Sequence, residues 1–231
     1  RVVEMLSMYS SVGLGSTVQW LPHLSKFADE LGRAGFRVII GHRGAKAMHE
    51  GQVLGCDYSS LKSIERAVDC FVIVGSMFHA LGLGLITTKP VLAVDPEPQR
   101  LEWVEEIVRK IYSQRYASIS KFREARRIGV IVSVKPGQMR LGLARKLRDM
   151  LRQHGYEADI LVTDEVSESL IMESKYDAYV NTACPRLSVE DQARLAKPLL
   201  LPSEVMVAVG RLRWEEIIKN ELFLSLSLPE K

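Results

Sequence analysis

The cysteines are the first residues whose chemistry has to be explained, because the chain contains only three of them. Cys56 lies between a glycine and an aspartate, and Cys184 is followed by Pro185, which supplies no N–H and fixes a turn. A thiolate in a loop can bind a metal or reach a substrate, although a lone loop cysteine is more often a small buried apolar group. Neither belongs to a CxxC pair, so no zinc ribbon or thioredoxin-like site is predicted. Cys70, inside the apolar run 70–74, is predicted to lie in the core.

The polar residues near these loops allow several kinds of binding. His79 follows an apolar run and could bind a ligand, act as an acid or base, or be a hydrogen-bonded loop histidine. Lys135 and Gln138 flank Gly137 in a segment that resembles an anion-receiving turn at a helix start. Arg186 could form a bidentate pair with a carboxylate or be an ordinary surface arginine. No P-loop or dinucleotide-binding fingerprint is present.

The composition is that of an ordinary globular protein. Of the 231 residues, 47% are apolar and 26% are charged, which argues against collagen-like, low-complexity and disordered classes. No apolar stretch approaches the ~20 residues that cross a bilayer, and the first residues lack the pattern of a secretory signal. Together with the few cysteines, these features predict a protein of the reducing cytoplasm with no membrane partner.

Charge is distributed unevenly along the chain. The formal net charge is +3, but residues 109–152 hold 13 Lys/Arg against 2 Asp/Glu, a net charge of +11 for this segment. Such a segment could dock an acidic protein or nucleic acid, or form the solvated face of two helices. Direct nucleic-acid binding is the least favoured of these, because the segment lacks the interleaved aromatic residues that stack on bases.

Two stretches of the chain repeat one order of elements: strand, amphipathic helix, glycine with an aromatic residue, strand. A glycine after each helix is the residue type that a left-handed helix end favours. The elements expected in the first stretch are a strand at 12–18, a helix at about 22–34 and strands at 37–41, 69–75 and 91–95. Those expected in the second are a strand at 128–133, a helix at about 138–154 and strands at 159–162, 178–181 and 199–201.

These elements predict the α/β fold class, with two homologous parallel-sheet domains. Continuous β-branched runs are typical of strands buried on both faces of a parallel sheet, and alternating strands and helices imply right-handed crossovers. We expect a linker remnant at 1–11, a domain carrying Cys56 at 12–127 and a domain carrying Cys184 at 128–231. Ligands of such sheets bind at the carboxyl ends of the strands. The segments that contain Cys56, His79, Gln138 and Cys184 are expected at these strand ends.

Four short segments of the chain together resemble the diphthamide synthase family. They are Gly51–Cys56 (GQVLGC), Phe78-His79, Lys135–Gln138 (KPGQ) and Asn181–Ser188 (NTACPRLS). The resemblance extends from Val12 to about Gly210, and the strings GQVLGC and ACPR are specific in this order. Members of the family make 2-(3-amino-3-carboxypropyl)histidine, the product of the first step of diphthamide biosynthesis.

The resemblance implies three homologous α/β domains around a central [4Fe–4S] cluster, with one cysteine from each domain. Cys56 and Cys184 match the cysteines of the second and third domains. The remaining iron would bind S-adenosylmethionine, and cleavage of the Cγ–S bond would give a 3-amino-3-carboxypropyl radical that adds to a histidine of translation elongation factor 2. By the same analogy Arg186 would hold the methionine carboxylate, and Gln138 and His79 would line the pocket. The implied partners are elongation factor 2, an electron donor protein and a second subunit, in a homodimer or in a heterodimer with a paralogue.

The chain departs from the family pattern in two places. The family's first domain and its cysteine have no counterpart, so the sequence is either a truncated piece or a short paralogue. With two thiolates the cluster would be poorly held, and the chain alone would then be inactive. Trp20 stands where relatives often have histidine, which would alter that rim of the pocket. These departures keep a second hypothesis open, a non-catalytic paralogue or scaffold subunit that docks a partner through the basic segment 109–152.

Overall fold

The computed structural model describes residues 1–189, 195–219 and 222–228. It divides into two compact units, Arg1–Arg109 and Lys110–Lys231. The division falls inside helix α5 (Glu105–Arg123), whereas the sequence places the boundary after residue 127. None of the helices in the described part of the chain is long and apolar enough to cross a membrane.

The first unit is built on a five-stranded sheet in the order β2-β1-β3-β4-β5. Its strands are β1 (Ser11–Ser16), β2 (Arg37–Ile40), β3 (Cys70–Val74), β4 (Val91–Asp95) and β5 (Arg100–Trp103). The first four are parallel, as predicted, while β5 is an antiparallel addition next to β4. The sequence does not predict β5, because the strand is short and half polar. The chain reverses before it through Gln99, a non-glycine residue with φ of 52°.

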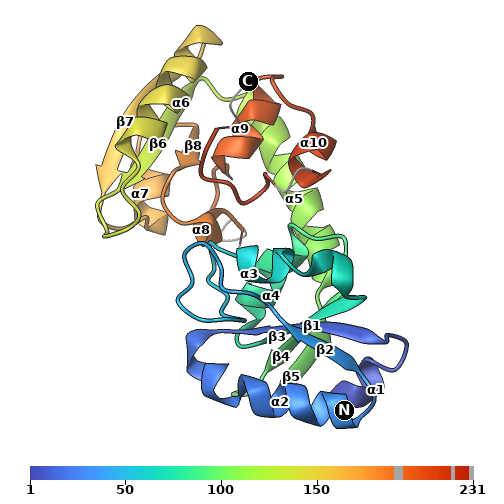
Figure 1. Ribbon diagram of the computed structural model, residues 1–231. Coiled ribbons are helices and arrows are strands. Elements are labelled where there is room, and N and C mark those ends of the chain that lie inside the picture. The colour runs from blue at the N-terminus through green and yellow to red at the C-terminus, as the bar shows by residue number, and fades with distance from the viewer. Residues whose placement is uncertain (190–194, 220–221, 229–231) are drawn as a thin grey trace. The chain divides into compact units, whose positions relative to one another are not determined.

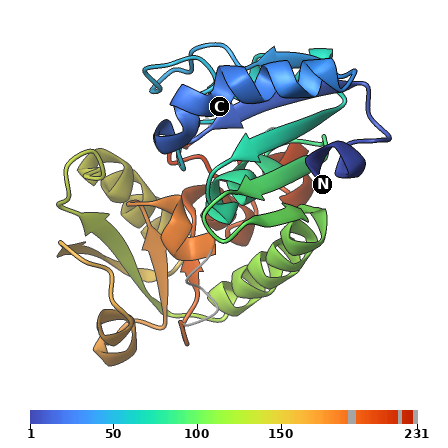
Figure 2. The same ribbon diagram turned by 90° about the horizontal axis from the view of Figure 1, so that it is seen from below.

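Helices cover both faces of this sheet (Figure 1). The helices of the first unit are α1 (Val2–Met5), η1 (Val18–Trp20), α2 (Leu21–Arg33), α3 (Ser59–Lys62), η2 (Glu65–Ala67) and α4 (Met77–Gly84), and the unit ends within the first residues of α5. α2 packs on β1 and β2, and α4 packs on β3 and β4 from the other side. In Figure 2, α2 lies over β1, and β3, β4 and β5 follow beside it without being covered by that helix.

The first residues belong to the core of this unit. α1 places Val2 and Met5 against the core cluster, and Leu6 is fully buried. The ring of Tyr9 lies 5.5 Å from that of Trp103, measured between centroids. The expectation of a linker remnant at 1–11 therefore does not describe this segment, because a short apolar helix removes its side chains from water by packing on the sheet.

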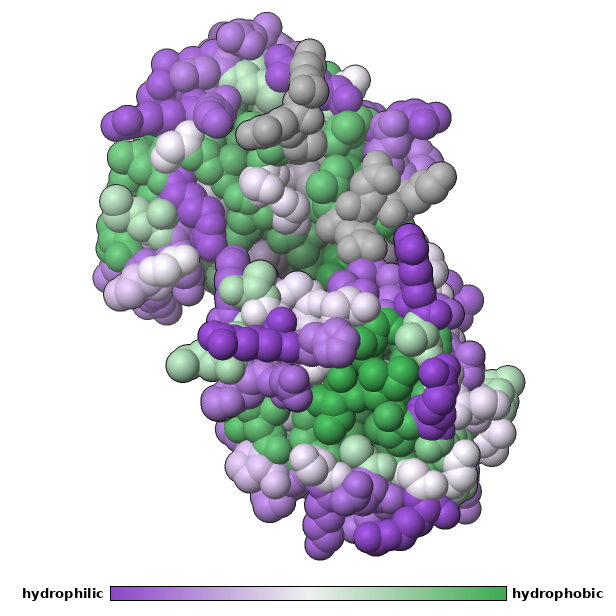
Figure 3. Space-filling model, viewed as in Figure 1, coloured by the Kyte–Doolittle hydropathy of each residue, from purple (hydrophilic) through white to green (hydrophobic). Residues whose placement is uncertain are grey.

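β2 forms an open edge of the first sheet. Its three apolar residues, Val38, Ile39 and Ile40, are half-buried. Figure 3 shows apolar side chains gathered at the surface of the first unit on this side. The strand is only four residues long, and a short edge strand limits pairing with other chains.

The second unit is built on a four-stranded parallel sheet in the order β7-β6-β8-β9. Its strands are β6 (Arg127–Ser133), β7 (Glu157–Thr163), β8 (Ala178–Asn181) and β9 (Leu199–Leu200). The helices that follow α5 are α6 (Leu141–Gln153), α7 (Glu168–Glu173), α8 (Pro185–Val189), α9 (Pro202–Ala208) and α10 (Trp214–Lys219). α6 packs on β6 and β7, as α2 packs on β1 and β2. The four parallel strands have the same order in both units, so the predicted internal repeat is present in the fold.

Both units end the first long helix with the same turn. Gly35 and Gly155 have φ of 98° and 88°, a left-handed conformation in which a glycine has no Cβ to clash. The next residues, Phe36 and Tyr156, each donate the backbone N–H to the carbonyl of the leucine five residues earlier. This hydrogen bond satisfies a carbonyl at the helix end and directs the chain into the next strand.

An aspartate holds the start of the central strand in each unit. Asp177 Oδ2 accepts the backbone N–H groups of Arg126 and Arg127 at 3.1 and 2.8 Å. Asp69 accepts the two corresponding N–H groups at the start of β1. The hydrogen bond from the Arg127 N–H is the main reason that the pKa of Asp177 lies below its ordinary value.

Asp177→Ala is expected to lower the free energy of unfolding by about 1 kcal/mol at neutral pH, because two N–H groups lose a charged, largely solvated acceptor. Since the pKa of Asp177 is lower in the folded chain, this contribution is complete above the ordinary value of 3.8. It is lost as the pH falls through the folded value. Urea unfolding of both proteins should therefore show a difference at neutral pH that disappears in strong acid. Asp149→Ala, on the exposed side of α6, is the matched control, and a difference for Asp177→Ala that persists in acid contradicts the prediction.

Candidate metal and substrate sites

Cys56 lies at the tip of a tight turn at the carboxyl edge of the first sheet. Leu54 and Asp57 exchange two backbone hydrogen bonds of 3.1 Å across the turn. The residues just before it reach the end of β1, where Ser16 and Gln52 form a parallel bridge. Cys56 is exposed, so the predicted loop position of this thiol is confirmed.

The turn that carries Cys56 packs against the first turn of α4. A Cβ on Gly55 would lie 2.4 Å from the ring of Phe78, so glycine is required for this close approach. The Phe78 ring in turn lies edge-on to His79, with centroids 5.4 Å apart. His79 belongs to helix α4 and not to a loop as predicted, and its Nδ1 lies 2.9 Å from the hydroxyl of Ser76 at the helix start. Cys56 and His79 therefore sit on neighbouring segments of one sheet edge.

Asp57 holds the other side of the same turn. Its carboxylate accepts the backbone N–H groups of Lys46 and Ser59, at 2.6 and 3.0 Å, and the hydroxyl of Ser59. Burial by itself would raise the pKa of Asp57, but these hydrogen bonds lower it below its ordinary value. The carboxylate is therefore ionised at neutral pH and orders the segment beside the exposed thiol.

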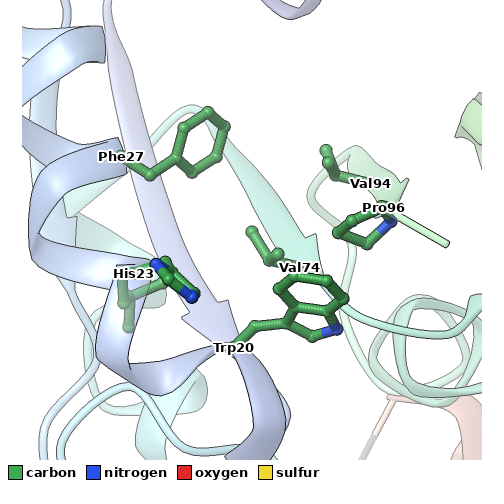
Figure 4. A pocket seen from close by; sticks show the side chains of 7 residues that line it. Trp20, His23, Phe27, Val74, Val94 and Pro96 are labelled. Atoms are coloured by element: carbon green, nitrogen blue, oxygen red, sulfur yellow. The ribbon is translucent and has the colours of Figure 1, made fainter. Parts of the chain in front are cut away.

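An apolar pocket of about 320 Å³ opens between α2 and the ends of β3 and β4. In Figure 4, Trp20, His23 and Phe27 face Val74 and Val94 across it. The complete lining is Trp20, His23, Leu24, Phe27, Val74, Val94 and Pro96. The pocket can accept an apolar or aromatic group, and Trp20 forms part of its rim.

A second pocket, of about 180 Å³, opens at the carboxyl edge of the second sheet. Ser133, the last residue of β6, and Gln138, in the turn that follows, line the pocket, as do Cys184 and Arg186, which follow β8. β6 and β8 are neighbouring parallel strands, so the segments that follow them meet at one edge. The pocket thus brings together four of the residues selected from the sequence, which are Lys135, Gln138, Cys184 and Arg186.

The same pocket carries charged side chains of both signs. Lys135 and Arg186 contribute positive charge, while Asp164 and Glu165, which follow β7, contribute negative charge. A site of this kind suits a ligand that carries a carboxylate and an ammonium group, as an amino acid does. The two acidic residues were not selected from the sequence, because nothing in their local pattern marks them.

Asn181, which is fully buried, shapes the turn that presents Cys184. Its Nδ2 donates to the Cys184 carbonyl at 2.7 Å and to the Ser188 hydroxyl at 3.0 Å. Its Oδ1 accepts the N–H of Ala183 at 2.9 Å. In the sequence, Asn181 stands out only as part of the NTACPRLS motif. An asparagine at the end of an apolar strand, followed by turn residues, is the signal that could have identified it.

Cys70 differs from the other two cysteines in burial. It is fully buried in β3, and this burial, together with the charges of Asp69 and Glu105, raises the pKa of its thiol to about 12. The prediction that it belongs to the core is confirmed. Among the described residues, no group of three or more His, Cys, Asp or Glu side chains could hold a metal ion. In this part of the chain each unit offers one accessible thiol, Cys56 or Cys184.

Part of the basic segment 109–152 is used inside the second unit. The Arg115 guanidinium is buried, pairs with Glu204 and donates to the carbonyls of Ser188 and Leu199. Arg123 donates to two carbonyls of α9. The hypothesis of a docking segment therefore has to rest on its exposed cations alone.

The model of a protein family described as "Putative diphthamide synthesis protein" matches residues 2–219. This chain belongs to that family. The resemblance drawn from the GQVLGC and ACPR strings is thereby confirmed. The match covers both units, including the turn of Cys56 and the pocket of Cys184.

Curated members of the diphthamide synthesis family are similar along almost the whole chain. The 2-(3-amino-3-carboxypropyl)histidine synthase of Pyrococcus horikoshii is 38% identical over 212 residues, which cover 91% of this chain and 60% of that protein. Subunit 1 of the synthase from Schizosaccharomyces pombe is 26% identical over 228 residues, or 95% of this chain and 51% of that protein. The chain is therefore homologous to this enzyme and spans about half to three fifths of the length of these relatives.

Solved structures of the family share the fold. A crystal structure of Dph2 from Pyrococcus horikoshii with a 4Fe-4S cluster superposes with a TM-score of 0.80 at 33% identity, covering 92% of this chain and 60% of that one. A further crystal structure of Dph2 from the same organism gives a TM-score of 0.83. The predicted α/β fold class is confirmed.

Proposed function

We propose that this chain provides the second and third domains of a 2-(3-amino-3-carboxypropyl)histidine synthase. The reaction moves the 3-amino-3-carboxypropyl group of S-adenosylmethionine to a histidine of translation elongation factor 2, the first step of diphthamide biosynthesis. The observation that carries the proposal is the pocket lined by Gln138, Cys184 and Arg186 at the edge of the second sheet. Similarity to the Pyrococcus enzyme over 91% of the chain supports it.

In this proposal Cys56 and Cys184 are two protein ligands of a [4Fe–4S] cluster. Thiolate is the usual protein ligand of such clusters, and these cysteines are the accessible thiols of the described residues. The donor type therefore fits, whereas a third thiolate has to come from outside the residues of this chain. When bound and reduced, the cluster supplies the electron that cleaves the Cγ–S bond of S-adenosylmethionine.

The chain's own residues bind and orient the substrate. Arg186 is assigned to the methionine carboxylate, because a guanidinium can bind a carboxylate through two parallel hydrogen bonds. Gln138 lines the same pocket, and Asp164 and Glu165 place negative charge where the substrate ammonium can lie. His79 is assigned to line the substrate site from the first unit. A substrate held through both charged groups of its methionine end keeps one orientation of that end, which directs a reactive radical to a single product.

The wider assembly is proposed on the same grounds. The histidine acceptor belongs to elongation factor 2, an electron donor protein supplies the reducing equivalent, and a second subunit completes a dimer in the cytoplasm. Eukaryotic relatives are named as subunit 1 of the synthase, which supports the expectation of a second subunit.

Replacing either accessible cysteine tests the cluster assignment. After anaerobic reconstitution with iron, sulfide and a small thiol as the additional ligand, the chain is expected to be brown. Cys56→Ser and Cys184→Ser should each lose most of the bound iron and the visible absorption, because a hydroxyl is a poor ligand for this metal centre. Cys70→Ala is the matched control and should retain both, because Cys70 is buried in β3.

The second measurement is the conversion of S-adenosylmethionine to methylthioadenosine by the reduced protein. The control variant Cys70→Ala should behave as the unmodified chain does. A chain that stays colourless after reconstitution, or iron content that is independent of Cys56 and Cys184, would rule the assignment out.

A further inference from the structure

Arg140 connects the two turns that form the Cys184 pocket. Its Nη1 donates to the carbonyls of Gln138, Thr182 and Ala183, at 3.2, 3.1 and 2.8 Å. Its Nη2 lies 3.4 Å from the carbonyl of Gly137. The first turn follows β6 and the second follows β8, so one side chain joins segments that are more than 40 residues apart in the sequence.

The chemistry of the guanidinium explains why this position favours arginine. A guanidinium is planar and has five N–H donors in a fixed geometry, so it can bind carbonyls of two different segments at once. A lysine ammonium keeps the charge but concentrates its three donors on one atom, and it cannot reach both turns with the same geometry. Arg140 itself is not among the residues that line the pocket, so its effect on a ligand has to pass through the backbone of the two turns.

Asn181 has a more local role. Its hydrogen-bond partners, Ala183, Cys184 and Ser188, all belong to the turn after β8 and the helix that follows. It can therefore shape that turn but cannot connect it to the turn of Gln138. Thr182 also ties the turn after β8 to strand β6, because its hydroxyl donates to the Ile131 carbonyl at 2.7 Å. The hydrogen bonds between that turn and the turn of Gln138 come from Arg140.

We propose that Arg140 is a positioning residue that sets the separation of Gln138 and Cys184, and with it the width of the pocket between them. Its significance for substrate binding rests on the function proposed above. The hydrogen bonds that Arg140 forms between the two turns do not depend on that function, and their effect on the turn of Cys184 can be measured in the chain without iron. Loss of the link should let the turn of Cys184 open, because local opening is governed by the few contacts that hold a loop.

The test is the rate at which iodoacetamide alkylates Cys184 relative to Cys56 in the same iron-free chain, measured by mass spectrometry of the peptides. Arg140→Ala is expected to raise this ratio about tenfold, and Arg140→Lys about threefold, because the lysine retains part of the donor set. Cys56 lies in the first unit and serves as an internal standard. Cys70 is fully buried and becomes alkylated only if the fold opens globally.

The matched control is Arg152→Ala. Arg140 is the N-cap residue of α6, and Arg152 belongs to the last turn of the same helix. Arg152 likewise donates to a backbone carbonyl, that of Ala158 at 2.8 Å near the start of β7, away from the pocket. This variant should lower stability to a similar extent and leave the ratio of Cys184 to Cys56 unchanged.

An unchanged ratio in a folded Arg140→Ala chain overturns the proposal, as does an equal rise in Arg152→Ala. If Arg140→Ala unfolds and Cys70 becomes alkylated, the ratio of Cys184 to Cys56 alkylation in Arg140→Lys is used instead. An unchanged ratio in the folded lysine variant overturns the proposal. If the unmodified chain binds no iron, the proposed function fails while the alkylation result still stands. In the active synthase, Arg140→Lys should raise KM for S-adenosylmethionine more than it lowers kcat.

Discussion

Glu204→Gln is expected to lower the free energy of unfolding of the second unit by about 3–5 kcal/mol, the usual effect of breaking a buried ion pair from one side. The side chains of Arg115 and Glu204 are 1% and 0% exposed. Arg115 Nε donates to Glu204 Oε1 at 2.8 Å, and Nη2 donates to Oε2 at 2.5 Å. Glu204 also accepts the N–H of Leu201 at the start of α9. The glutamine variant keeps the shape of the side chain but leaves the buried guanidinium without a counter-charge.

Thermal and urea unfolding measure this loss, and Tm should fall by more than about 10 °C. Glu216→Gln is the matched control. Glu216 also accepts the N–H of the residue three positions earlier and pairs with that residue, Arg213, but the pair is exposed. Its replacement should lower stability far less, because an exposed ion pair contributes little. Equal losses in the two variants would contradict the prediction.

Replacing both partners of the buried pair separates charge from packing. The double variant Arg115→Met with Glu204→Leu should recover much of the loss, because apolar side chains of similar volume need no counter-charge. The same variant removes the hydrogen bond from Arg115 to the Ser188 carbonyl in α8, the helix that follows Cys184. We therefore expect the double variant to regain stability without fully regaining the native shape of the Cys184 pocket.

Arg186→Ala is expected to weaken binding of S-adenosylmethionine roughly 30-fold, which corresponds to about 2 kcal/mol for a charge-assisted, partly solvated pair. The ligand provides its own test, because decarboxylated S-adenosylmethionine lacks only the group that Arg186 is assigned to bind. The unmodified protein should prefer the carboxylated ligand by about the same factor. Arg186→Ala should show little preference, and Arg186→Lys an intermediate one, because lysine cannot form two parallel hydrogen bonds.

Isothermal titration of both ligands into each reconstituted protein checks this prediction. Arg145→Ala, on the exposed side of α6 and outside the pocket, is the control for loss of one positive charge from the same unit. A preference for the carboxylate that survives in Arg186→Ala would assign its recognition to another residue, of which Lys135 is the first candidate in the pocket.

Much of the secondary structure follows from local patterns in the chain. The β-branched runs, the amphipathic helices and the glycines at Gly35 and Gly155 predict the repeated strand and helix order, since each signal involves residues close in sequence. The same is true of the cysteine environments. A cysteine beside turn residues is exposed or half-exposed, whereas Cys70 within an apolar strand is buried. Fold class and family membership could therefore be inferred without coordinates.

Other features depend on contacts between distant residues, and only the tertiary structure decided them. By composition Arg115 belongs to a solvated basic segment, yet it is buried against a carboxylate 89 positions later. Arg140 and the acidic residues of the pocket lie on different loops, and their roles exist only once three parallel strands end at one edge. The hydrophobic period of a strand or helix specifies which face is buried, but it contains no information on which distant polar group completes a hydrogen bond there.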